Sequence, residues 1–97
     1  MMRLSLRLGQ NREEDKSKDL QELINALLGI RSKDEMEDFL KGILTPKELL
    51  EFPNRLKIIK MLKKGIAQQE IAQELKVGVA TVTRGSMELQ KGRFKNV

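Results

Sequence analysis

The spacing of small and apolar residues in the last third of the chain constrains the fold more than any other feature. Two short helices can cross at a tight turn only where the contact positions are small or apolar. Ala72, Val77 and Val82 have that spacing. The pattern therefore predicts a helix-turn-helix, with helices over residues 68–75 and 79–91.

The turn between these helices has one unusual position. A helix-turn-helix usually has glycine four residues after the small residue of its first helix, because the backbone there is left-handed. This chain has Lys76 at that position, and Gly78 comes two residues later. Two alternatives follow: Lys76 adopts the left-handed conformation at an energetic cost, or the turn has a different shape.

Two further helices are expected before residue 45. An apolar stripe at helical spacing predicts the first helix, over residues 19–28, with Asp19 as its N-cap. The stripe consists of Leu20, Leu23, Ile24, Leu27 and Leu28. The sequence from Ser32 to Glu35 has the form of a capping box and predicts the start of a second helix.

Two more helices are expected between residues 45 and 65. Thr45 followed by Pro46 predicts a helix start, with Glu48 completing a capping box. Pro53 predicts a break, so a separate helix is expected from Asn54, ending at Gly65.

These elements define an all-α chain with one helical domain over residues 19–97. No segment predicts a confident strand, although Leu4, Leu6 and Leu8 alternate briefly. Termini are commonly loose, so we expect residues 1–18 to form a flexible arm or tail.

Composition excludes several classes of function. The chain has no Cys and no His, which excludes disulfides, thiolate metal sites and imidazole catalysis. We therefore expect no enzymatic activity and no bound metal. A cluster of carboxylates is interpreted as a solvated helix face that complements the helix dipole near its N-terminus; it comprises Asp34, Glu35, Glu37 and Asp38. No apolar run is long enough to cross a membrane, and we expect a cytoplasmic protein.

Charge is distributed unevenly along the chain. Residues 1–19 have a net charge of +1, residues 20–51 of −3, and residues 52–97 of +7. The basic end is a candidate surface for a polyanion. Its predicted phosphate contacts include four lysines that precede the helix-turn-helix, namely Lys57, Lys60, Lys63 and Lys64.

The second helix of the helix-turn-helix begins with small and hydroxylic side chains. Such residues let a helix N-terminus approach base edges in the major groove of double-stranded DNA. The first helix begins with two glutamines suited to phosphate contacts. The predicted DNA-binding residues are Gln68, Gln69, Gly78, Val79, Ala80, Thr81 and Thr83.

Three segments give the chain a family resemblance. LTPKELLEFPNRLKIIKMLKKG, QQEIAQEL and GVATVTRGS occur in that order, and with their spacing the chain resembles the Trp repressor family over about residues 20–92. The resemblance implies an intertwined helical homodimer with a dimer core over residues 19–64 and a helix-turn-helix over residues 66–91. It also implies a repressor that binds operator DNA and controls genes of tryptophan biosynthesis or transport.

The same resemblance implies L-tryptophan as corepressor. Arg55 and Arg84 match the arginines on opposite faces of the indole, a role that suits guanidinium groups. Thr45 matches a position that helps to hold the ligand carboxylate, and Leu44 belongs to the helix end whose carbonyls receive the ammonium group. Gly85 leaves room beside the ring, and Glu88 replaces a serine near the amino group.

Alternatives remain open at this stage. Glu88 can pair with the ligand ammonium group, or it can block the site through a salt bridge to Arg84; in the second case the chain is a DNA-binding regulator that does not bind tryptophan. Phe94 can fill the groove that a further helix occupies in the family. A function of another class is a helical dimerisation or adaptor module whose basic face binds an acidic protein.

Overall fold

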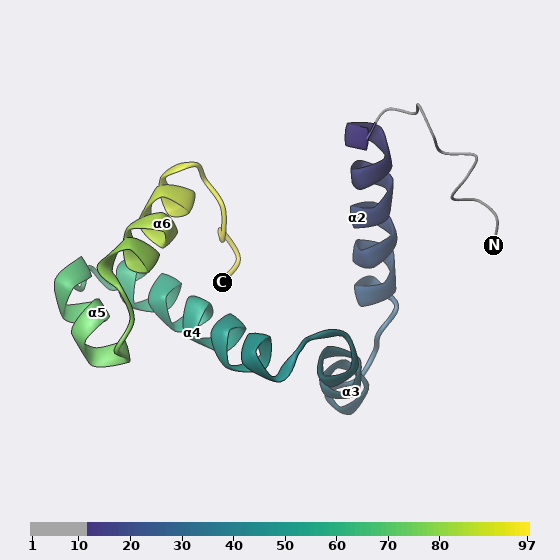
Figure 1. The fold of residues 1–97 in the computed structure, drawn as a ribbon, viewed down its shortest axis with the longest axis horizontal. Coiled ribbons are helices and arrows are strands. Elements are labelled where there is room, and N and C mark those ends of the chain that lie inside the picture. Colours follow the sequence, from purple (N-terminus) through teal and green to yellow (C-terminus); the bar gives the residue numbers. More distant parts are fainter. Residues whose placement is uncertain (1–11) are drawn as a thin grey trace. The chain divides into compact units, whose positions relative to one another are not determined.

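The computed structural model describes residues 12–97, which form helices and no strand (Figure 1). The five helices are α2 (Arg12–Leu28), α3 (Lys33–Ile43), α4 (Pro46–Lys63), α5 (Gln68–Leu75) and α6 (Val79–Gln90). The predicted all-α class is confirmed for this part of the chain. The alternating leucines lie outside it. The chain divides into two compact units that meet in sequence between Leu40 and Lys41.

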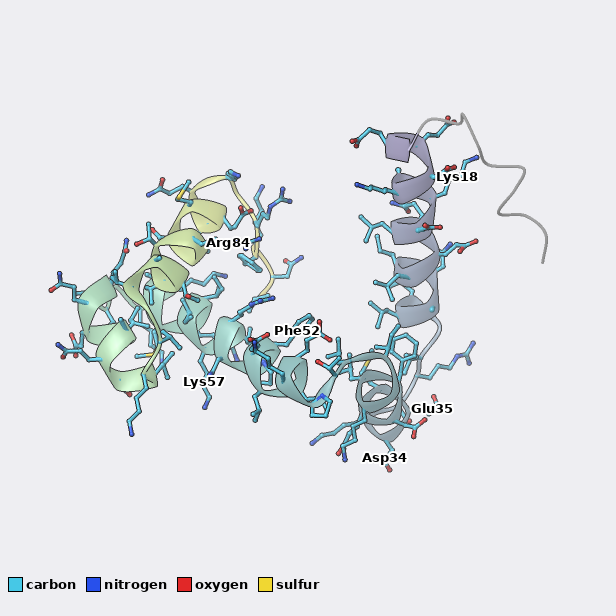
Figure 2. The ribbon with its side chains drawn as sticks, in the orientation of Figure 1. Lys18, Asp34, Glu35, Phe52, Lys57 and Arg84 are labelled. Carbon is cyan, nitrogen blue, oxygen red and sulfur yellow. The ribbon has the colours of Figure 1, made fainter. Side chains whose placement is uncertain are left out.

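Helix α2 begins at Arg12 rather than at the predicted Asp19. Its first turn carries Glu13, Glu14 and Asp15, whose negative charges complement the positive end of the helix dipole. An apolar stripe could not reveal this turn, because the turn is charged. The segment from Arg12 to Lys18, expected as part of an arm or tail, is therefore helical (Figure 2).

Helix α3 begins directly after Ser32, as predicted. The Glu35 backbone N–H donates to Ser32 Oγ over 3.0 Å, which satisfies one free donor of the first turn. Glu35 Oε1 accepts from the Arg31 N–H at 3.2 Å, one residue before the expected partner. Asp34 and Glu35 lie in the first turn (Figure 2), where carboxylates favour a helix start.

Helix α4 is one continuous helix, so the predicted break at Pro53 is wrong. Proline inside a helix removes one backbone hydrogen bond and crowds the carbonyl four residues earlier, at a cost of about 3 kcal/mol. Strong interactions on both sides oppose this cost. Thr45 and Glu48 form the predicted capping box at the start of the helix, and Ile58 and Ile59 are buried beyond the proline.

A small core joins α4, α5 and α6. Ile58, Ile71, Ala72 and Val82 form its buried cluster, and Ile71 and Val82 are completely inaccessible to solvent. Five partly buried residues pack against this cluster, namely Met61, Leu62, Ile66, Leu75 and Val77. The helix-turn-helix spacing therefore placed Ala72 and Val82 correctly on the inner face.

The turn between α5 and α6 follows the first of the two alternatives for Lys76. This residue is left-handed, with φ 57° and ψ 46°. The Val77 N–H donates to the Ala72 carbonyl over 3.1 Å, as in a Schellman motif, and Val77 packs against the core. The hydrogen bond and the apolar contact hold the strained residue in place.

Among residues 12–97, no helix combines the length and the apolar composition needed to cross a membrane. The same residues contain no group of three or more carboxylates suitably arranged to hold a metal ion.

Replacing Lys76 by glycine should stabilise the protein. Glycine relieves a left-handed strain of about 1–2 kcal/mol and loses about 0.5–1 kcal/mol through its freer unfolded state, for a net gain of roughly 1 kcal/mol. Denaturant unfolding followed by circular dichroism measures the change. Lys64→Gly is the matched control, because Lys64 caps α4 with φ −82° and gains nothing from glycine. Equal effects of the two substitutions would contradict the assignment.

Candidate functional site

Gly85 allows α6 to approach α4 closely. A Cβ atom at this position would lie 3.2 Å from Ile58 Cγ2 and 3.3 Å from Ile59 Cδ1. Both isoleucines are buried, so they have little freedom to move away. This close approach brings Arg84 and Glu88 of α6 to the side of α4 that carries Arg55.

A cavity of about 600 Å³ lies between these two helices. It is lined by apolar side chains together with two arginines and one glutamate. The lining residues are Phe52, Arg55, Leu56, Ile58, Ile59, Ala80, Thr81, Arg84, Gly85, Glu88, Phe94 and Val97. Of the predicted ligand-binding residues, the structure thus brings Arg55, Arg84, Gly85 and Glu88 together.

The two arginines are available to a ligand. Both side chains are exposed, and neither forms an ion pair within residues 13–97. The guanidinium carbon of Arg55 lies 5.2 Å from the centre of the Phe52 ring, a cation–π distance. Figure 2 shows Phe52 on α4 and Arg84 on α6. Guanidinium groups in such a cavity can pair with a carboxylate and stack on a planar ring.

Leu44 and Thr45 do not line this cavity. Thr45 caps the start of α4, and Arg55 lies ten residues further along. At 1.5 Å per residue the two positions are about 15 Å apart along the helix axis. Within a single chain, Leu44 and Thr45 are therefore not part of the site that contains the arginines.

Glu88 pairs with the residues that follow α6 and not with Arg84. Its Oε1 accepts from Arg93 Nε at 2.6 Å, and its Oε2 lies 3.3 Å from Lys91 Nζ. The hydrogen bonds from Arg93 and then Lys91 lower the pKa of the Glu88 carboxyl. The salt bridge to Arg84 that was considered from the sequence is not formed, and Arg84 stays unblocked.

Sequence reasoning missed several lining residues. Phe52 lies one helical turn before Arg55, and that spacing was a usable signal. Leu56 is adjacent to Arg55, whereas nothing in the sequence pointed to Val97. Phe94, which the sequence suggests could fill a groove of the dimer, lines the cavity in the single chain.

The predicted DNA-binding residues gather at the starts of α5 and α6. Gly78 is the N-cap of α6, and the side chains of Val79, Ala80, Thr81 and Thr83 are exposed. The Thr83 hydroxyl donates to Gln68 Oε1 over 2.7 Å. This bond joins the two helices and leaves the amide NH₂ of Gln68 free to act as a donor. The N-cap of α5 makes no side-chain hydrogen bond, so the first N–H groups of that helix are uncapped.

Two of these residues belong to both surfaces. Ala80 and Thr81 are exposed at the start of α6 and also line the cavity. A molecule in the cavity would therefore lie against the same turn of helix that faces outward as the candidate DNA-binding surface.

The four lysines predicted as phosphate contacts, three on α4 and Lys64 at its C-cap, differ in their interactions. Lys63 donates to the backbone carbonyl oxygens of Phe94 and Val97. Within residues 13–97, Lys57, Lys60 and Lys64 form no side-chain hydrogen bond or ion pair and are exposed. Figure 2 shows Lys57 on α4. Three of the four lysines predicted to contact phosphates therefore have no side-chain partner in this part of the chain.

Comparison with known proteins gives a consistent result. A family model described as Trp repressor protein matches residues 18–96. A protein from Vibrio campbellii named Trp operon repressor homolog is 36% identical over 78 residues, covering 79% of this chain and 78% of the relative. Proteins of the same name from Vibrio atlanticus and Xylella fastidiosa are 39% and 33% identical; these matches cover 72% and 76% of this chain and 72% and 82% of the relatives.

The ion pairs of Glu88 predict how its carboxyl titrates. Arg93→Ala removes the hydrogen bond that lowers the pKa most, so the pKa should rise toward its ordinary value; Lys91→Ala should raise it less. Because the folded pKa is depressed, the pairing stabilises the fold above the ordinary carboxyl range and is lost as pH falls through the folded pKa. Carbon-13 NMR of the Glu88 carboxyl measures both effects. An unchanged titration in Arg93→Ala would show that the pair is absent in solution.

Proposed function

The chain belongs to the Trp repressor family, and from this premise we propose that it is a homodimeric repressor activated by L-tryptophan. Members of the family are DNA-binding transcription regulators and not enzymes, which confirms the prediction that this chain has no catalytic activity. The observation that carries the proposal is the cavity between α4 and α6, which is lined by two arginines without an ion pair in residues 13–97 and by the start of a candidate DNA-reading helix.

The chemistry of the cavity suits an aromatic amino acid. Its volume of about 600 Å³ lies within the usual range for small-molecule sites, roughly 300–1,000 Å³. Ile58 and Ile59 provide an apolar surface for a ring, and Arg55 and Arg84 provide partners for a carboxylate and for the ring face. Glu88 is already paired with Arg93 and Lys91, so a ligand ammonium group would have to share a carboxylate whose charge is largely neutralised.

Exposed apolar residues support the homodimer. No side chain of residues 13–43 is buried, although α2 carries Leu20, Leu23 and Leu28. A stripe of exposed large side chains marks a surface that another molecule covers. We propose that a second copy of the chain covers it. Leu44 and Thr45 would then contact the ligand in the partner's cavity, since they are distant from the cavity of their own chain.

The shared residues Ala80 and Thr81 support a switch. A ligand in the cavity lies against the first turn of α6 and so favours one orientation of that helix. A preference of about 1–3 kcal/mol is sufficient for useful control. In the dimer, the favoured orientation would place the two α6 helices about one DNA turn apart, roughly 34 Å. We propose that the regulated genes serve tryptophan biosynthesis or transport, and that the protein acts in the cytoplasm.

The α5–α6 surface supports binding to duplex DNA. Val79, Ala80 and Thr81 are small enough to approach base edges, and Thr83 and Gln68 form a polar pair between the helices. Lys57, Lys60 and Lys64 are free to approach phosphates, which dominate the affinity of such complexes.

L-tryptophan should bind the wild-type protein, with one site per chain, and Arg84→Met should weaken the binding. Loss of a charge-assisted hydrogen bond costs about 1.5–3 kcal/mol, so the affinity should fall by roughly tenfold to a hundredfold. Isothermal calorimetry measures it. Arg31→Met is the matched control, because Arg31 lies outside the cavity lining. If the wild type releases no heat and gains no thermal stability at millimolar L-tryptophan, the corepressor role is wrong and DNA binding is judged separately.

Thr83→Val and Gln68→Leu should each weaken binding to a duplex selected by the protein from a random pool, by about tenfold. Because the two side chains bond to each other, the double variant should lose less than the product of the single losses. Gel shifts with the wild type, the two single variants and the double variant measure this double-mutant cycle. Multiplicative losses would contradict the coupling. Absence of any salt-dependent duplex binding by the wild type would instead favour an adaptor that binds an acidic protein.

A further inference from the structure

The chain turns back on itself after α6. Gly92 and Phe94 both have positive φ angles, 93° and 64°. The segment Arg93–Val97, here called the return segment, consequently runs back toward α4, as the yellow end of the trace in Figure 1 shows. A bulky residue with a positive φ is uncommon, and such strain persists only where the surrounding contacts enforce it.

Two sets of polar contacts hold the return segment. Lys63 on α4 donates to the carbonyl oxygen of Phe94 and, over 2.8 Å, to that of Val97. Arg93 pairs with Glu88 on α6 at 2.6 Å. The segment is therefore attached to both helices that form the cavity, and the attachment to α4 depends on a single lysine.

Phe94 and Val97 line the cavity without filling it. Both belong to its lining, and about 600 Å³ stays open with their side chains in place. Phe94 is 37% exposed, so the protein covers its side chain only in part. Because the cavity stays open beside both side chains, they form part of its wall and do not close it.

We propose that the return segment forms the outer wall of the ligand cavity, that Phe94 is a specificity-determining residue for a planar aromatic ligand, and that Lys63 positions it. The ligand part of the proposal rests on the proposed function. An aromatic side chain in the lining, in addition to Ile58 and Ile59, offers ring–ring contact to an aromatic ligand and excludes water from it. Lys63 is then a positioning residue of the cavity and does not serve as a phosphate contact.

The placement of the segment can be tested without any ligand. The chain contains no Trp, so F94W introduces one fluorophore at the wall. Its emission should be blue-shifted relative to free indole, and Lys63→Met in the F94W background should shift it to the red and at least double the quenching by acrylamide. Lys60→Met, one turn earlier on α4, is the matched control and should leave both unchanged. Solvent-like emission in F94W alone, or no response to Lys63→Met, would overturn the proposal.

The role in ligand selection has its own measurement. Phe94→Ala should weaken L-tryptophan binding about threefold to tenfold in calorimetry, and Phe94→Leu should restore less than half of that loss because it is apolar but not planar. Lys63→Met should cause a similar loss. Tighter binding by Phe94→Ala would identify Phe94 as a competitor of the ligand and overturn the proposal. If the wild type binds no L-tryptophan, the corepressor role is wrong. The placement of the return segment is then tested by the emission of F94W alone.

Discussion

The close approach of α6 to α4 at Gly85 is the contact on which the rest of the structure depends. It requires a residue without a side chain against Ile58 and Ile59, and both isoleucines are held by burial. The same approach brings Arg84 and Glu88 to the side of α4 that carries Arg55. A larger residue at position 85 would force the isoleucine side chains to shift by a few tenths of an ångström, so this glycine contributes to both the packing and the cavity.

The cavity and the candidate DNA-binding surface share one turn of helix. Ala80 and Thr81 are exposed on one side and line the cavity on the other, so the start of α6 lies between the two sites. Packed helices move as units and do not deform continuously. In the proposed switch, communication between a ligand and DNA would therefore need no long path; a change in how α6 lies against α4 would be sufficient.

The electrostatics of the basic half are more specific than its net charge of +7 indicates. Arg55 and Arg84 line the cavity, Arg93 and Lys91 neutralise Glu88, and Lys63 binds carbonyl groups of the return segment. These charged side chains line the cavity or hold the residues that surround it. The lysines that stay free to contact a phosphate include Lys57, Lys60 and Lys64.

Local signals in the sequence determined most of the secondary structure. Caps such as Thr45 and Ser32, the turn after Leu75 and the small residue Ala72 act within a few residues of their partners, so they were predictable. The continuous helix at Pro53 and the charged start of α2 were not predictable, because burial of Ile58 and Ile59 opposes the cost of the proline and a charged turn has no apolar stripe. Only the tertiary structure decided that Glu88 pairs with Arg93 and that Phe94 and Val97 reach the cavity. Those contacts depend on where the chain turns after Gly92. The left-handed Phe94 is held by Lys63, which is distant in sequence, so no periodic pattern of residues predicts it.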